Sequence, residues 1–598
     1  YASQTDPSKG ELRIHTETHT QRRIPASTKQ INTMKQQTGV VRLSAAATML
    51  LMLLLSQSIS TVTMVAGVAI NPRHCRGTVK HVHIAVGRDP TTEMTVSFTT
   101  KWAFPGVEAP IAGILVGRRK DQLGRFVREQ ELPLTYNTSL PFEHWGHYYA
   151  PYQHHITIGG LEPDTTYFYQ VVLGDRGAGI EELEQKALTG KIDGNNLRHR
   201  PGNNGYAIEN TTAEDQFLSE QQMNDEEEDF NRRHRMLAPP PYDGHEKPCP
   251  ENKRIRTFKT APETDQDMPV TFAIVGDLGQ FEFTKNTVIH MKRHKKDYDA
   301  ALLIGDIAYT ENDERRWETF FDFMDDFTPF DQMPLMIATG NHDIEKQANR
   351  REVFRGYEHR FRMPRVRPPQ LGLFDGPMGD LNMDAAPYPM PYEWGNAYYS
   401  FEYGSAYIIV ISAYSNMDPD STQYNWLSAE LESVDRTRTP WLLISMHVPI
   451  YNTFDLHHHD LQIVAAREHV QPLLIEHKAN MIFSGHIHAY QRTGNIIEDA
   501  VRHPHGPIHI TIGAGGRACN APFQHEIAEE WIEQRDATMY GYGKFQIHNR
   551  TDAEWVWIPV APSDKRDYNF IKHNDTVHLP SLKEDSVWVK NQFHLANE

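Results

Sequence analysis

Five short apolar runs in the second half of the chain each lead to a polar residue that can bind a metal ion. The runs cover residues 270–275, 300–304, 334–338, 441–444 and 481–483. A short apolar run bounded by glycine or polar residues predicts a buried strand. In layered α/β folds, ligand sites gather where such strands end. We therefore expect the polar residues that follow the five runs to lie together.

The alternation of polar and apolar residues in the first third of the chain predicts a separate all-β domain. Strands are predicted at 81–85, 93–99, 154–158 and 255–260. In residues 159–172 a Leu-x-Pro turn precedes a tyrosine-rich run, which resembles the fibronectin type III pattern. We expect a β-sandwich over residues 70–262.

A polar insertion interrupts this predicted sandwich between its last two strands. Residues 176–252 are rich in Glu, Asp, Asn, Gln and Arg. Such a composition cannot bury enough apolar surface to offset the entropy lost on ordering, so we expect a largely disordered loop.

The remaining residues predict a domain of alternating strands and helices over 265–560. Helices are predicted near 283–296, 313–326 and 422–434, between the apolar runs. Residues 364–393 form a second insertion, dense in Pro, Gly and Met, and 561–598 form a polar C-terminal tail.

The N-terminal residues 1–69 resemble a secretory signal peptide preceded by an upstream segment. An apolar run at 43–55 follows Lys35 and Arg42, and small residues come after it. This is a signal-peptide pattern, with Met34 as a candidate start of translation. We expect cleavage and no membrane span in the mature protein; a signal anchor is the alternative.

Charge and cysteine content narrow the class of protein further. The 598 residues include 60 Lys and Arg against 78 Asp and Glu, a net charge of −18, which argues against nucleic acid as the main partner. Cys75 and Cys249 flank the front domain, and their pairing stays open. Glycosylation acceptors stand at Asn137, Asn210, Asn549 and Asn574.

The polar residues after the apolar runs have the chemistry of a two-metal site. Two metal ions about 3.5 Å apart can hold a phosphate group and activate water, and their mutual repulsion requires an anionic bridge. Asp306 is the candidate bridge. His486 and His488, at i and i+2, face the same side of an extended segment, so one could serve each metal. Asn341 and His342 are adjacent, which favours one ligand and one outer group.

Tyr309 decides which metals suit this site. A phenolate is a hard anionic donor that suits ferric iron. Many two-metal phosphoesterases carry an Asp-x-His sequence in the first segment, whereas here Gly279 stands two residues after Asp277. Tyr309, three residues after Asp306, fills the missing position.

These motifs together resemble the larger plant and fungal purple acid phosphatases, within the calcineurin-like metallophosphoesterases. The segments that carry the resemblance are Gly-Asp-Leu-Gly at 276–279, Gly-Asp-Ile-Ala-Tyr at 305–309, Gly-Asn-His-Asp at 340–343, Ile-Ser-Met-His at 444–447 and Gly-His-Ile-His at 485–488. The resemblance is strong over 265–560 and weak over 75–175. It implies a fibronectin type III-like β-sandwich followed by an αββα metallophosphoesterase sandwich.

The resemblance also implies a role for each site residue. Fe(III) ligands are Asp277, Tyr309 and His488; ligands of a divalent Zn, Mn or Fe ion are Asn341, His447 and His486; Asp306 bridges the two. His342 and His457 are expected to contact the phosphate, and one of them to protonate the leaving group. The alternative for His457 is a solvated loop over 457–459. Asp343 is expected to orient His342.

The implied activity is hydrolysis of small phosphate monoesters by a secreted acid phosphatase. The resemblance implies an acidic optimum and a purple colour, and the signal-peptide pattern predicts a location outside the cell, in the cell wall or in the vacuole. One alternative is a phosphodiesterase or nucleotide pyrophosphatase on the same metal core. Another is an inactive surface binding module built on the sandwich domain.

Overall fold

The computed structural model describes most of the two predicted domains. The described ranges are 79–103, 107–139, 147–174, 254–264, 267–311, 313–344, 353–364, 392–519, 521–560 and 585–591, together with a few single positions. The predicted signal peptide, Cys75 and Cys249, and most of the predicted insertions at 176–252 and 364–393 lie outside the described residues.

Two antiparallel sheets build the N-terminal domain. The first has the order β1-β2-β7 and the second β4-β3-β8-β9, with β5 and β6 paired separately. The strands are β1 Lys80–Val86, β2 Met94–Trp102, β3 Ile111–Gly117, β4 Arg125–Arg128, β5 Asn137–Ser139, β6 His147–Tyr149, β7 Pro151–Ile158, β8 Thr166–Gly174 and β9 Arg256–Lys259. Buried residues of both sheets, among them Ile84, Val96, Ile114 and Tyr169, form one core, which confirms the β-sandwich.

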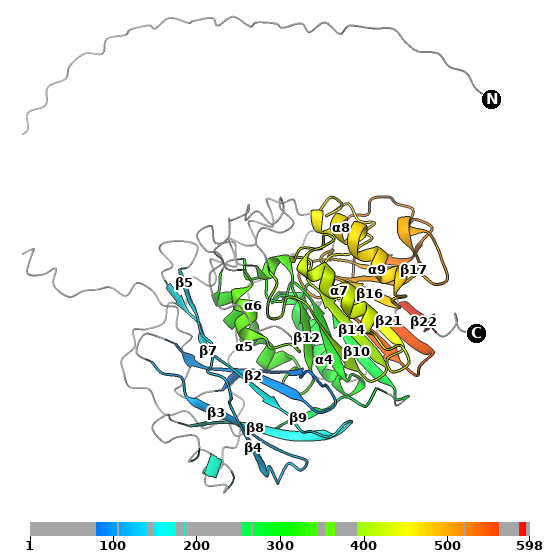
Figure 1. Ribbon diagram of the computed structural model, residues 1–598. Coiled ribbons are helices and arrows are strands. Elements are labelled where there is room, and N and C mark those ends of the chain that lie inside the picture. The colour runs from blue at the N-terminus through cyan, green and yellow to red at the C-terminus, as the bar shows by residue number, and fades with distance from the viewer. Residues whose placement is uncertain are drawn as a thin grey trace, which may run out of the picture. The chain divides into compact units, whose positions relative to one another are not determined.

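The second domain contains two larger sheets (Figure 1). The six-stranded sheet has the order β12-β11-β10-β20-β21-β22, and the seven-stranded sheet β13-β14-β15-β16-β18-β17-β19. Their strands are β10 Val270–Val275, β11 Ala300–Ile304, β12 Leu335–Ala338, β13 Tyr399–Tyr403, β14 Ala406–Ile411, β15 Trp441–Met446, β16 Met481–Ser484, β17 Tyr490–Asn495, β18 Ile508–Ile512, β19 Ile532–Asp536, β20 Tyr540–Ile547, β21 Asp552–Val560 and β22 Asp585–Lys590.

Helices cover these sheets and complete the predicted αββα architecture. They are α4 Glu282–Arg293, α5 Arg315–Phe327, α6 Arg355–Arg360, α7 Thr422–Ser433, α8 Leu461–Ala465 and α9 Gln471–Glu476. In α5, Trp317, Phe320, Phe321 and Met324 are buried, the spacing of an amphipathic helix. Helix α7 is capped at its N-terminus by Ser421, whose hydroxyl accepts a hydrogen bond from the backbone N–H of Tyr424.

The C-terminal segment contains a strand that the polar sequence of the tail did not indicate. Strand β22 pairs with β21 at the edge of the six-stranded sheet. Its first residue, Asp585, accepts hydrogen bonds from Tyr490 Oη (2.7 Å) and from the Arg492 guanidinium. Residues 585–590 therefore belong to the second domain.

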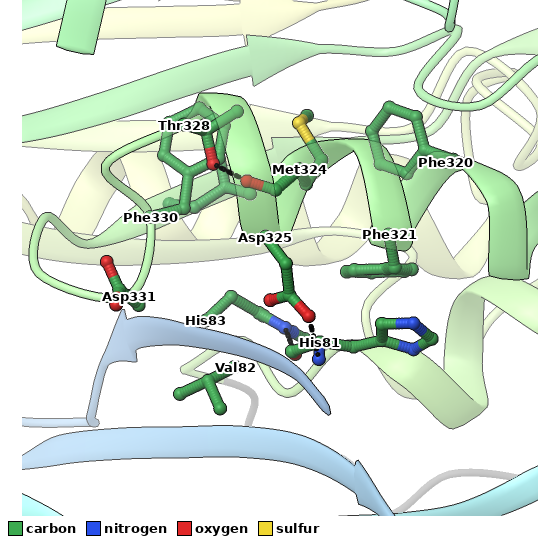
Figure 2. A pocket seen from close by; sticks show the side chains of 11 residues that line it. His81, Val82, His83, Phe320, Phe321, Met324, Asp325, Thr328, Phe330 and Asp331 are labelled. Atoms are coloured by element: carbon green, nitrogen blue, oxygen red, sulfur yellow. Dashed lines mark hydrogen bonds between the residues drawn. The ribbon is translucent and has the colours of Figure 1, made fainter. Parts of the chain in front are cut away.

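Buried polar contacts join the sandwich to the second domain. In Figure 2, residues of β1 face the side chains of α5, and the backbone N–H of His81 donates to Asp325 Oδ2 at 2.7 Å. Arg360, which is 1% exposed, donates to Tyr136 Oη (2.6 Å), Tyr148 Oη (2.8 Å) and Glu318 Oε1 (2.7 Å). Both tyrosines belong to the sandwich, so this buried guanidinium fixes how the two domains meet.

No helix within the described residues is both long enough and apolar enough to cross a lipid bilayer.

Candidate metal centre

The predicted site residues follow the carboxyl ends of parallel strands in both sheets. Strands β10, β11 and β12 are parallel in one sheet, as are β14, β15, β16 and β18 in the other. Asp277, Asp306 and His447 follow β10, β11 and β15, are at most 1% exposed, and place one ligand atom each within 4.8 Å of one another. The two sheets thus bring their strand ends to one place, as the sequence pattern predicts.

One group of donors gathers around the Tyr309 phenol. The Tyr309 hydroxyl lies 2.9 Å from His488 Nε2 and 3.3 Å from Asp277 Oδ1. His488 Nε2 and Asp277 Oδ1 are 3.5 Å apart. Two oxygens and one imidazole nitrogen therefore face a common point, and these are the three residues expected to hold ferric iron.

A second group of donors gathers around the Asn341 side-chain oxygen. Asn341 Oδ1 lies 3.3 Å from His447 Nε2 and 3.1 Å from His486 Nδ1. His447 Nδ1 lies 2.8 Å from the carbonyl oxygen of Ile304, which leaves Nε2 to face the site. These are the three residues expected to hold the divalent ion.

Asp306 lies between the two groups. Its Oδ1 is 3.4 Å from His447 Nε2, and its carboxylate also interacts with the Tyr309 hydroxyl. Its Oδ1 accepts the backbone N–H of His342 at 2.9 Å, which fixes the carboxylate in place. This position between both groups is the one that a bridging ligand needs.

The backbone carries these residues on sharp turns and not on extended segments. Asp277, Asp306, Tyr309 and His486 have φ values of 53°, 49°, 51° and 68°, in the left-handed region that residues other than glycine rarely adopt. His486 and His488 therefore do not lie on one side of an extended segment, and that prediction was wrong. Each imidazole nevertheless reaches a different donor group. Asn341 and His342 likewise lie in a 3-10 helix, Asn341–Asp343.

Gly279 explains why Tyr309 can occupy its position. Gly279 has φ +58°, and a Cβ atom there would lie 2.9 Å from Tyr309 Cδ2 and 2.4 Å from Phe281 Cε2. Any side chain at residue 279 would collide with both rings. The absence of a histidine side chain at residue 279 thus leaves the space that the Tyr309 ring occupies.

His342 lies beside the donors but is held by a residue that the sequence did not single out. Its Nδ1 contacts Glu311 Oε1, its ring stacks on Tyr309 with centroids 4.5 Å apart, and its Nε2 is 3.9 Å from Asp306 Oδ2.

Asp343 was expected to orient His342. Instead, its carboxylate accepts the backbone N–H groups of Ile307 and Ala308 at 2.9–3.1 Å, so it fixes the turn that carries Asp306 and Tyr309.

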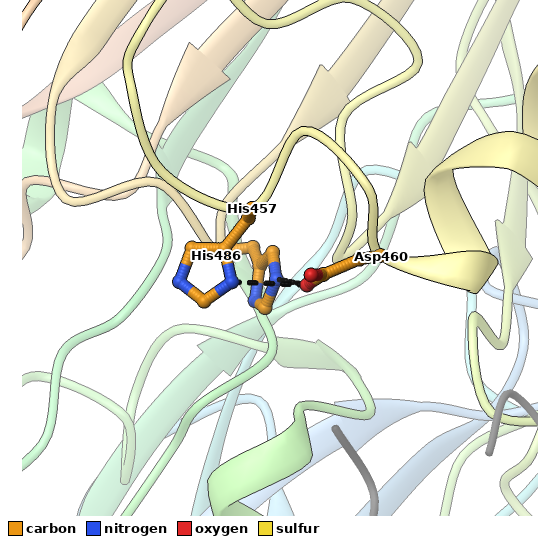
Figure 3. A group of neighbouring side chains, drawn as sticks. All are labelled: His457, Asp460 and His486. Carbon is orange, nitrogen blue, oxygen red and sulfur yellow. Dashed lines mark hydrogen bonds and ion pairs between the residues drawn. The ribbon is translucent and has the colours of Figure 1, made fainter. Parts of the chain in front are cut away.

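The loop at 457–459 does reach the site through one of its histidines. Figure 3 shows His457 and His486 directed toward the same carboxylate, Asp460 Oδ2, at 2.9 Å each. The two imidazole rings are 4.2 Å apart between centroids. His457 therefore lies next to a predicted metal ligand, and Asp460, which sequence reasoning missed, links the two.

The electrostatics of the site suit bound cations. Burial, together with Asp306, raises the pKa of Asp343 to about 7. Burial opposes protonation of His447, but Asp306 and Asp277 outweigh it and raise its pKa to about 9, while burial lowers the pKa of His486 to about 3. Buried carboxylates require compensating positive charge. The set of carboxylates, phenol, amide oxygen and imidazoles fits two metal ions of hard or intermediate character.

Family models match three consecutive stretches of the chain. A calcineurin-like phosphoesterase model matches residues 270–490. A model described as the purple acid phosphatase N-terminal domain matches 79–183, and one described as iron/zinc purple acid phosphatase-like protein C matches 506–565. The order of these matches confirms the predicted succession of a sandwich and a phosphoesterase domain.

Curated relatives and a solved structure agree with these models. Purple acid phosphatase 18 of Arabidopsis thaliana is 35% identical over 301 residues, covering 50% of this chain and 61% of the relative, less than two thirds of its length. Purple acid phosphatase 22 of the same plant is 32% identical over 342 residues, covering 57% and 68%. The structure of a purple acid phosphatase from yellow lupin seeds has a TM-score of 0.56 and 18% identity, covering 84% of this chain and 78% of that one, which supports the fold.

The packing of Gly279 gives a direct test of the site. We expect Gly279→Ala to displace Tyr309 and to lower the metal content of the purified protein by at least about tenfold, since each lost ligand contact weakens metal binding strongly. Elemental analysis measures this. Gly124→Ala is the matched control, because a Cβ there has no neighbour within 4 Å. Full metal content in Gly279→Ala would contradict the role given to this packing.

Proposed function

This chain belongs to the purple acid phosphatase family, and from that membership we propose that it hydrolyses phosphate monoesters with Fe(III) and a divalent metal ion. The observation that carries the proposal is the convergence of seven donors in two groups that share Asp306. Tyr309 stands in the group with Asp277 and His488, where ferric iron would bind. Asn341, His447 and His486 would hold the divalent ion.

The identity of the second metal is part of the proposal. Zn, Mn and Fe all accept a set of one amide oxygen, one carboxylate and two imidazoles. The match of residues 506–565 to an iron/zinc family model supports zinc beside iron. When bound, the pair of ions would supply positive charge to the phosphate and an activated water molecule.

The protein's own residues bind and orient the substrate. The ligand carboxylates and His447 are buried, whereas the side chains of His342 and His457 are 31% and 40% exposed. Exposure next to a buried centre is what a residue that touches substrate requires. Glu311 and Asp460 each contact Nδ1 of one of these histidines, which orients the two imidazole rings.

Protonation of the leaving group follows from the same geometry. In its protonated form, a histidine whose Nδ1–H donates to a carboxylate carries a second donor, Nε2–H, and that proton can pass to the departing oxygen. His342 and His457 both satisfy this condition.

A monoester preference tests the reaction class. We expect a higher kcat/KM for p-nitrophenyl phosphate than for bis-p-nitrophenyl phosphate, because the two ions are best matched to a phosphate with two free negative charges. Steady-state kinetics on both esters measures this. A diester preference would instead favour the phosphodiesterase alternative.

The bridging role of Asp306 gives a separate test. Asp306→Asn should lower turnover at least about a hundredfold and reduce metal content with it.

The phenol ligand predicts a spectroscopic signature. We expect Tyr309→Phe to remove the visible band that arises from charge transfer between tyrosinate and iron, measured by absorption spectroscopy of the purified protein. Tyr414→Phe is the control: Tyr414 is also buried and donates to Asn341 Oδ1 at 3.4 Å, but it is no proposed ligand. An unchanged band in Tyr309→Phe would rule out ferric coordination by this residue.

We also propose that the protein follows the secretory route. The support is the signal-peptide pattern within residues 1–69 and four Asn-x-Ser/Thr acceptors, of which Asn137 is exposed on β5. Protein expressed in a eukaryotic host should lose mass on treatment with an N-glycosidase, and Asn137→Gln should lose one glycan. An unglycosylated product recovered from the cytosol would count against this route.

A further inference from the structure

A glycine-rich loop carries one arginine to the metal centre. Arg517 lies shortly after β18, and the loop before it packs on the first metal-binding segment, with Gly515 N donating to Gly276 O (3.1 Å) and Arg517 N to Asp277 O (3.3 Å). A Cβ atom at Gly515 would lie 2.2 Å from Gly276 O. Only glycine permits this approach, so the position of Arg517 beside Asp277 is built into the backbone.

The guanidinium group of Arg517 is oriented by two aromatic rings. Its central carbon lies 4.6 Å from the centre of the Phe281 ring and 5.8 Å from that of Tyr309, a predicted iron ligand. A guanidinium stacked on aromatic faces keeps its N–H groups at the edges available, in the planar arrangement that suits phosphate and carboxylate.

This cation has no anionic partner in the described part of the chain. Arg517 is half-buried, yet no carboxylate there lies within ion-pair distance of its guanidinium. By contrast, Arg360 contacts Glu318 at 2.7 Å, and Arg492 contacts Asp585 at 2.6 Å. A fixed, unpaired guanidinium at the edge of an anion-binding centre is available to a ligand.

We propose that Arg517 is a specificity-determining residue that binds a second anionic group of the substrate. The inference rests on the proposed function and names its substrate class: phosphate compounds that carry a further phosphate or carboxylate. The chain has a net charge of −18, and Glu311 and Asp460 adjoin the site, so a second anion would be repelled without a nearby cation. Arg517 supplies that cation next to the group that holds the scissile phosphate.

The test compares three substrates in Arg517→Ala and in the unaltered protein. Pyrophosphate carries a second phosphate, phosphoenolpyruvate carries a carboxylate, and p-nitrophenyl phosphate carries neither. We expect kcat/KM to fall about tenfold for the substrates with a second anion and less than about threefold for p-nitrophenyl phosphate, since a charged hydrogen bond of this kind contributes on that scale. Comparing the first two substrates identifies which second anion is recognised.

Two further variants distinguish a loss of anion recognition from a general loss of structure. Arg517→Lys keeps the charge and should recover part of the preference for doubly anionic substrates. Arg535→Ala is the matched control, because Arg535 also lies over an aromatic ring, 4.2 Å from Phe523, but is paired with Glu529. We expect its three kcat/KM values to change in equal proportion. An equal loss for all three substrates in Arg517→Ala would overturn the proposal.

Equilibrium binding distinguishes failure of this inference from failure of the proposed function. Isothermal calorimetry with orthophosphate and pyrophosphate should show a Kd for pyrophosphate that rises about tenfold in Arg517→Ala, with little change for orthophosphate. Unchanged or equally weakened binding of both anions overturns the role of Arg517. Selective loss of pyrophosphate binding in a protein that hydrolyses none of the three substrates would support Arg517 and refute the phosphatase proposal.

Discussion

The burial of Asp277 and Asp306 at the ends of adjacent parallel strands is the constraint on which the site depends. Both carboxylates are at most 1% exposed, and such burial is unfavourable without compensating charge or hydrogen bonds. Backbone N–H groups of His342 and His486 supply part of this compensation. The left-handed turns after β10 and β11 aim the carboxylates inward, so local backbone strain is concentrated where the metal ions would bind.

The sequence predicted the strands before the site well, because each is a fully apolar run bounded by glycine or polar residues. Strands β10 and β11 have the bounds that the apolar pattern indicated, and every predicted donor lies at the shared centre. The backbone geometry was predicted less well. His486 was expected in an extended segment but has φ 68°, since a turn between two strands leaves no periodic signal in the sequence.

Polar contacts between residues far apart in the chain could also not be predicted from the sequence pattern. Glu311 contacts His342, and Asp460 contacts His486, only because loops from separate strands meet in space. Their charges resemble those of many solvated loop residues, so nothing in the sequence distinguished them. Nothing in the sequence distinguished Arg360 either. Its burial between the two domains depends on two tyrosines that lie 224 and 212 positions earlier in the chain. Its guanidinium is paired with Glu318 of the same domain and donates hydrogen bonds to two tyrosines of the other domain.

The place of β20 in the six-stranded sheet has a consequence for biosynthesis. β10, which leads to Asp277, lies between β11 and β20, and β20 is formed by Tyr540–Ile547. During translation every proposed ligand therefore leaves the ribosome before the sheet that supports the first of them can close. A premature stop codon between residues 488 and 540 would yield a nascent chain that retains all seven donors and still cannot assemble the centre.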